Sequence, residues 1–95
     1  MIFARVVGSV VSTVRTDGVE GARYLLVELC THRGESKGSY MVAIDQHQSG
    51  RGDLVIVSQG SSCRQTEQTH QTAVDALIVG IIDSVEAHGQ TVYRS

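Results

Sequence analysis

Short segments rich in valine, isoleucine and leucine recur along the chain, and glycine or serine residues bound each of them. This pattern is typical of β-strands joined by turns. Four such segments lie at residues 4–14, 24–30, 40–45 and 53–58. The chain contains no proline, so glycine has to interrupt and turn the strands. Four strands at this spacing predict a small, mostly antiparallel, all-β barrel.

Gly8 lies in the middle of the first segment, among the β-branched residues of VVGSVV. A glycine inside a strand often marks a bulge or a sharp bend where the strand curls around a barrel. We therefore expect the first strand to bend at Gly8. The turn before the third segment is expected in HRGESKG, residues 32–38, and the turn before the fourth in QHQSGRG, residues 46–52.

Residues 72–87 fit two secondary structures. Apolar residues recur there at helical spacing, at Val74, Leu77, Ile78, Ile81 and Val85. The internal Gly80 and the β-branched residues around it favour an extended chain instead. We expect a short helical turn at residues 72–76 and a strand at 77–85. A last strand at 90–94 is expected to pair with it as a hairpin across the turn AHG.

The length of the chain allows one small domain, which we place at residues 1–95. With 41% hydrophobic and 19% charged residues, the composition is that of an ordinary globular protein. A chain of this length buries only about 60–65% of the surface that it exposes when unfolded. Association with further chains would therefore add stability, and we expect the working unit to be an oligomer.

The charges argue against nucleic acid and membranes as partners. The net charge is −2, and the single lysine, Lys37, and the seven arginines are spread along the chain. Binding to phosphate backbones needs a concentrated basic surface. Arg5 interrupts the apolar N-terminus, and no stretch approaches the length of a membrane span. We therefore expect a cytoplasmic protein.

Cys63 and the histidines are the residues that could carry catalysis or bind a metal. A catalytic thiolate needs an imidazole within hydrogen-bonding reach, and no local signature of a cysteine hydrolase surrounds Cys63. The histidines lie apart in expected loops, without a metal-binding spacing to a cysteine, at His32, His47, His70 and His88. Cys30 and Cys63 are expected to be reduced thiols. We expect no catalytic residue, metal or cofactor, and keep a cysteine enzyme as a third hypothesis.

The stretch GDLVIVSQGSSCRQ, residues 52–65, runs from an apolar strand directly into a loop of small residues. Its GSS is similar to a phosphate-binding turn, but the lysine and the following helix of a phosphate loop are missing. A barrel of this size is also the scaffold of oligonucleotide-binding (OB) modules, which stack bases on aromatic side chains in a positive groove. Because aromatic residues make up only 4% of the chain, a nucleic-acid-binding module is the second hypothesis.

The sequence resembles the vertex proteins of bacterial microcompartments, a family that includes small shell proteins of ethanolamine-utilisation compartments and of carboxysomes. Two stretches carry the resemblance, VAIDQHQSGRGDLVIVSQGSSCRQ at 42–65 and AVDALIVGIIDSV at 73–85. The first combines Ala43, Ile44 and Asp45 with a glycine-containing loop, an apolar strand and a small-residue loop. The second adds an aspartate, Asp75, and the run GIID. FARVVGSVVSTV and YLLVEL also occupy the expected places, so the resemblance covers nearly the whole chain.

Three positions depart from the pattern of that family. The loop that usually reads glycine-alanine-glycine is Gln48, Ser49 and Gly50 here, so the first turn position has to accommodate a side chain. Cys63 stands where alanine is common, and Ala73 stands where proline is often found. None of these changes removes a group that a structural role requires.

The resemblance implies a cyclic homopentamer of five- to six-stranded OB-like barrels, each with a short helical turn. Such a pentamer closes the corners of a polyhedral protein shell and has a structural rather than a catalytic role. Hexameric and trimeric shell proteins are the implied partners. Small residues suit places where chains converge, so we expect one loop near the axial opening or a subunit boundary, formed by Gly60, Ser61, Ser62, Cys63 and Arg64.

Two contacts of the pentamer follow as expectations. Arg64 is expected to bridge to a carboxylate of the next subunit, with Asp45 and Asp75 as the candidates. The alternative is that these charges cap local turns. A second loop is expected to be exposed and to contact a neighbouring hexamer or nothing, and it consists of Gln48, Ser49, Gly50 and Arg51.

Overall fold

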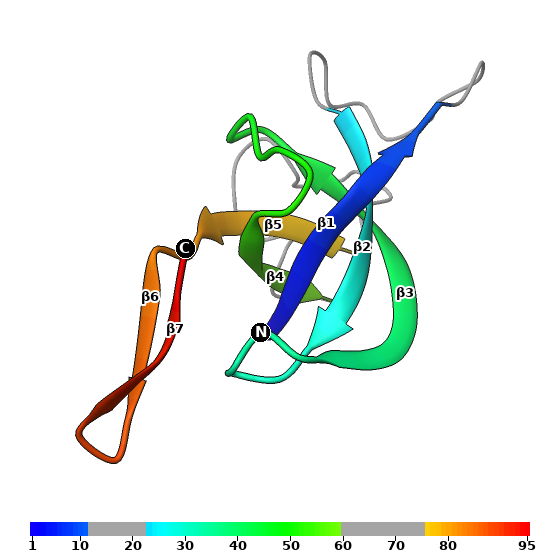
Figure 1. The fold of residues 1–95 in the computed structure, drawn as a ribbon. Coiled ribbons are helices and arrows are strands. Elements are labelled where there is room, and N and C mark those ends of the chain that lie inside the picture. Colours follow the sequence, from blue (N-terminus) through cyan, green and yellow to red (C-terminus); the bar gives the residue numbers. More distant parts are fainter. Residues whose placement is uncertain (12–22, 60–75) are drawn as a thin grey trace.

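The computed structural model describes residues 1–11, 23–59 and 76–95, and every regular element in these ranges is a β-strand (Figure 1). The strands are β1 (Ile2–Val10), β2 (Arg23–Cys30), β3 (Ser36–Asp45), β4 (Leu54–Gln59), β5 (Ala76–Ile81), β6 (Ser84–Ala87) and β7 (Gln90–Arg94). The first five form a closed barrel in the order β1-β2-β3-β5-β4, and β6 and β7 form a separate two-stranded sheet. All barrel pairs are antiparallel except β3 with β5. The prediction of a small, mostly antiparallel barrel is therefore confirmed.

Alternating side chains of the five barrel strands fill the interior. The buried members of this core are Ala4, Val6, Leu25, Val27, Ala43, Val55, Val57, Ala76 and Ile78. Successive side chains of a strand point to opposite faces, so one face of each strand can line the core while the other meets solvent or a second layer. The β1–β2 register shifts between Val6 and Gly8, which confirms the predicted irregularity at Gly8.

Several expected boundaries are wrong. Residues 36–38 lie in β3 rather than in a turn, because the chain already pairs with β2 at Ser36, opposite Cys30. The single strand expected at 77–85 is interrupted, since β5 ends at Ile81 and β6 starts at Ser84. Ala76, expected at the end of a helical turn, is the first residue of β5, and the rest of that turn lies outside the described residues.

The β6–β7 hairpin forms as predicted and extends from one side of the barrel (Figure 1). Its two-residue turn consists of His88 and Gly89, with φ of 54° and 77°. Two successive positive φ values are characteristic of the type I′ turn, whose twist matches that of the flanking strands.

The base of the hairpin covers part of the outer surface of the barrel. Val85 and Tyr93 pack against a second apolar cluster, whose buried members are Cys30, Leu54 and Ile82. Because an isolated two-stranded ribbon is only marginally stable in water, this contact is what gives the hairpin a fixed place.

Arg5 connects the barrel to the hairpin and to two loops. Its Nη1 donates a hydrogen bond to the carbonyl oxygen of Gly52 (2.9 Å), and its Nη2 donates one to the carbonyl oxygen of Gly34 (3.1 Å). The guanidinium also lies over the ring of Tyr93, 5.8 Å from the centroid. Such a cation–π contact adds to the packing that holds the hairpin.

Candidate functional site: the loop after strand β3

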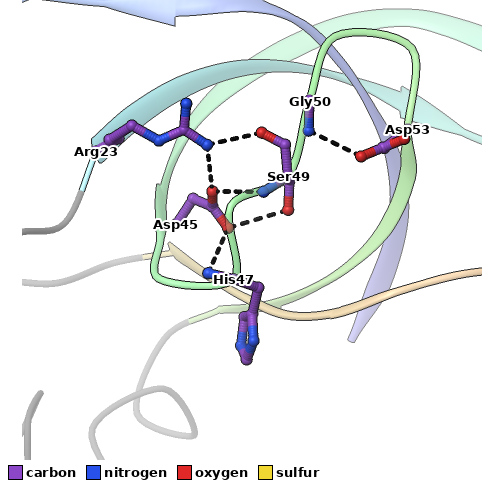
Figure 2. Close-up of polar contacts among 6 residues, drawn as sticks. All are labelled: Arg23, Asp45, His47, Ser49, Gly50 and Asp53. Carbon is purple, nitrogen blue, oxygen red and sulfur yellow. Dashed lines mark hydrogen bonds and ion pairs between the residues drawn. The ribbon is translucent and has the colours of Figure 1, made fainter.

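Asp45 is a buried carboxylate at the end of β3, where the chain enters the loop to β4. Each of its oxygens accepts two hydrogen bonds (Figure 2). Oδ1 accepts from the backbone N–H of His47 (3.0 Å) and from the Ser49 hydroxyl (3.0 Å). Oδ2 accepts from the backbone N–H of Ser49 (2.9 Å) and from Arg23 Nη2 (2.8 Å). The carboxylate therefore fixes the first turn of the loop.

Arg23 compensates the charge of Asp45 from the neighbouring strand. The two residues are direct partners in the β2–β3 register. Arg23 Nη2 also donates to the carbonyl oxygen of Ser49 at 2.7 Å, so one guanidinium binds both the carboxylate and the loop backbone. The Arg23 side chain is 53% exposed whereas that of Asp45 is 0% exposed, so the ion pair is open to solvent only on the arginine side.

The rest of the loop is fastened to the barrel through its backbone. The N–H of Gly50 donates to Asp53 Oδ2 (2.8 Å), and the N–H of Asp53 donates to the carbonyl of Gly50 (3.0 Å). The N–H of Gly52 donates to the carbonyl of Val6 on β1 (2.8 Å), and the N–H of Val6 donates to the carbonyl of Asp53 (2.9 Å). These hydrogen bonds hold the loop against β1 and the start of β4.

The second candidate loop, residues 48–51, presents only some of its side chains. Gln48, Gly50 and Arg51 are exposed, whereas Ser49 is 1% exposed and points its hydroxyl at Asp45. Gln48 has a φ of 59°, in the region that favours glycine, so the first turn position does accommodate a side chain as expected. A partner approaching this loop would meet Gln48 and Arg51.

Burial would raise the pKa of Asp45, but hydrogen bonds from His47, Arg23 and Ser49 outweigh it and hold the pKa below the ordinary value of 3.8. A carboxylate with a lowered pKa stabilises the fold at pH values above its unfolded pKa. That stabilisation disappears as the pH falls through the folded pKa. The chain is therefore expected to lose stability as the pH falls from about 5 to about 2.

Urea unfolding of the unmodified chain and of Asp45→Asn at several pH values checks this pH dependence. The difference in unfolding free energy between the two proteins should shrink as the pH falls through that window. A difference that stays constant down to about pH 2 would contradict the prediction.

The site has the chemistry of a structural anchor. The donors to Asp45 are the side chain of Arg23 on β2 and groups of the following loop, and the Asp45 side chain is fully buried. Within residues 1–11, 23–59 and 76–95, no group of three or more histidine, cysteine or acidic side chains is placed to hold a metal. In those same ranges, no helix has the length and apolar character that a membrane span requires.

Sequence reasoning selected Asp45 but did not find Arg23. The signal was present, because Arg23 directly precedes one expected strand and Asp45 ends the next one. In an antiparallel pair these two positions face each other. The other expected interface residues, Gly60, Ser61, Ser62, Cys63, Arg64 and Asp75, lie outside the described residues.

Comparison with known proteins decides the family. Residues 1–83 match the model of a protein family described as ethanolamine utilisation protein EutN/carboxysome. The chain belongs to the EutN/carboxysome family. The resemblance seen in the sequence is therefore confirmed, and the family match ends just before the β6–β7 hairpin.

Individual members of the EutN/carboxysome family are similar over nearly the whole chain. The bacterial microcompartment shell vertex protein GrpN of Rhodospirillum rubrum is 40% identical over 86 residues, which are 90% of this chain and 97% of GrpN. The shell vertex protein EutN of Escherichia coli is 37% identical over 99% of both chains. These relatives are named as shell proteins and not as enzymes.

A solved structure supports the fold as well. The GrpN pentameric microcompartment shell protein from Rhodospirillum rubrum superimposes with a TM-score of 0.80 and 40% identity, covering 92% of this chain and 99% of that one. The expected barrel architecture is therefore that of a solved family member.

Proposed function

We propose that the chain is a structural vertex protein of a bacterial microcompartment shell and acts as a homopentamer. The observation that carries the proposal is the similarity to GrpN, which is 40% identical, is named a shell vertex protein and has a solved structure described as pentameric. The nucleic-acid-binding hypothesis has no comparable support, because the curated relatives are named as shell proteins.

The physical task of such a protein is to introduce curvature. A shell tiled by flat hexameric units has none, so closure requires units of five-fold symmetry at the corners. A cyclic pentamer uses a heterologous interface, in which one patch meets a different patch on the next subunit until the ring closes. We propose that residues 1–95 form one such unit and that it works in the cytoplasm as part of the shell.

Three finer assignments belong to the same proposal. The loop at residues 60–64 lies near the axial opening or a subunit boundary, where small residues avoid collisions. Arg64 bridges to Asp75 of the next subunit, since Asp45 is already bound by Arg23 within its own chain. Gln48 and Arg51, both exposed, contact a neighbouring hexameric or trimeric shell protein.

Native mass spectrometry and sedimentation equilibrium of the purified chain test the proposal. The expected mass is five times that of the 10.2 kDa chain. Co-expression with a hexameric shell protein should then give closed particles, and omission of the vertex chain should leave open sheets or tubes. A chain that stays monomeric at high concentration would contradict the proposal.

A further inference from the structure

A groove of about 360 Å³ opens where β1 and the loop after β3 separate. Within the described residues, the last backbone hydrogen bonds between the two segments join Val6 to Gly52 and Asp53. The register shift between Val6 and Gly8 follows directly, and a bulge bends the strand that contains it. A Cβ added at Gly8 would meet no atom within 4 Å. The bend in β1 therefore leaves open space beside the loop.

The ionisable side chains that line this groove among the described residues are both arginines. Arg23 of β2 and Arg51 of the loop line it together with residues 6–9 of β1, and we call it the β1 groove. The larger cleft between the hairpin and the barrel, of about 550 Å³, is different because Asp53 and Asp83 line it beside its arginines. The β1 groove thus combines positive charge with a lining that contains no carboxylate.

Arg23 has hydrogen-bond donors left for a ligand. Its Nη2 donates both to Asp45 and to the carbonyl oxygen of Ser49, whereas its Nη1 points away from these acceptors (Figure 2). Neither Nη1 nor Nε donates to any residue that the structure describes. The side chain is 53% exposed, so a ligand can reach these donors. Because Nη2 is already held at two points, less freedom is lost when a ligand binds the same guanidinium.

Arg51 and Ser9 bring further donors to the β1 groove. Both residues are exposed, and in the ranges that the structure describes neither side chain makes a hydrogen bond or an ion pair. The charge of Arg23 is compensated by Asp45, so the uncompensated charge of the groove is that of Arg51. A guanidinium can bind two oxygens of a carboxylate or a phosphate through parallel hydrogen bonds.

We propose that the β1 groove binds a small soluble oxyanion, a molecule that carries a carboxylate or a phosphate group. Arg51 supplies the uncompensated charge, Arg23 a guanidinium that is fixed in place, and Ser9 a hydroxyl. All of these donors come from one chain, so the site does not depend on a ring of subunits. Because Arg51 is also assigned to the contact with a neighbouring shell protein, a bound oxyanion would compete with that contact.

NMR titration of the isotope-labelled chain tests the site, with inorganic phosphate and acetate as separate probes. Each probe replaces chloride at constant pH and ionic strength, so that general screening does not change. Saturable shifts are expected at the backbone amides of residues 7–9 and 49–51. Saturation by either anion supports the site and identifies the group that it prefers. Absence of saturable shifts with both anions, or shifts centred on Arg94 in the cleft beside the hairpin, overturns the inference.

Arg51→Gln should weaken binding of the saturating anion by at least about tenfold, because it removes a charge-assisted contact. Arg51 is exposed and unpaired among the described residues, so the variant should fold normally. Arg33→Gln is the matched control, since Arg33 is also exposed and does not line the β1 groove. It should bind as tightly as the unmodified chain. Equal affinities of the two variants would overturn the site.

Native mass spectra of the same samples separate this inference from the proposed function. If the chain is pentameric and binds neither anion, the oxyanion site is overturned while the vertex function stands. If the chain is monomeric and binds an anion in the β1 groove, the site is supported while the proposed function fails.

Discussion

Asp45→Ala is expected to lower the free energy of unfolding by about 3 kcal/mol. The substitution removes the acceptor of two backbone N–H groups and one hydroxyl, supplied by His47 and Ser49. It also removes the partner of Arg23, whose other hydrogen bond goes to the Ser49 carbonyl. Because Asp45 is buried, water cannot easily replace the lost acceptor.

Urea unfolding at neutral pH and constant protein concentration measures the loss, since assembly adds stability that depends on concentration. Arg23→Ala is the matched comparison and should cost about 1 kcal/mol. The arginine is half exposed, and its removal leaves Asp45 with three of its four hydrogen bonds. Equal losses in the two variants would show that the ion pair, and not the loop hydrogen bonds, is the main contribution of Asp45.

The barrel could be predicted from the sequence because its interior requires an apolar residue at every second position of a strand. Leu25 and Val27 alternate with outward residues in YLLVEL, and Val55 and Val57 do so in LVIV. Strand periodicity and glycine positions are enough to recover such elements. The hairpin was predicted because the short segment AHG separates two strand patterns, and the structure limits the turn to His88 and Gly89.

The strand boundaries that were predicted wrongly lie where buried and exposed residues do not alternate along the sequence. Residues 36–38 are exposed and contain no apolar side chain, so nothing in their sequence distinguishes a solvent-facing strand from a turn. The break between β5 and β6 was missed because Ile81 and Ile82 are both apolar, so the sequence looks like a continuous strand. In the structure Ile81 is exposed and Ile82 is buried. Ile82 follows the end of β5 and packs in the cluster under the hairpin. Only the three-dimensional contact of hairpin and barrel reveals the break.

The site was only partly predictable for a related reason. Asp45 was selected by its place in the family pattern, as one of two candidate carboxylates for Arg64 across a subunit boundary. In the structure its partner is Arg23, which the β2–β3 register places directly opposite. Pairing the ends of consecutive antiparallel strands would have supplied this partner, whereas the hydrogen bonds from the loop depend on a backbone shape that the sequence does not encode locally.

Gly34→Ala is expected to destabilise the chain by about 2–3 kcal/mol and to loosen the β6–β7 hairpin. Gly34 has a φ of +83°, which costs an alanine about 1–2 kcal/mol. A Cβ there would also lie 2.8 Å from Arg5 Nη2 and 3.0 Å from Tyr93 Cδ1, too close for either contact. The Arg5 guanidinium would have to shift, which weakens its hydrogen bond to Gly34 and its contact with the Tyr93 ring.

Gly38→Ala is the control that separates the two costs of Gly34→Ala. Gly38 has nearly the same φ, +79°, but a Cβ there has no atom within 4 Å, so only the backbone cost of about 1–2 kcal/mol should remain. Urea unfolding compares the total stabilities, and hydrogen exchange of the β6–β7 amides reports whether the hairpin opens locally. Faster exchange in the hairpin of Gly34→Ala alone is the expected result. Equal exchange in both variants would mean that the Arg5–Tyr93 contact does not hold the hairpin, and that the packing of Val85 against the barrel is sufficient.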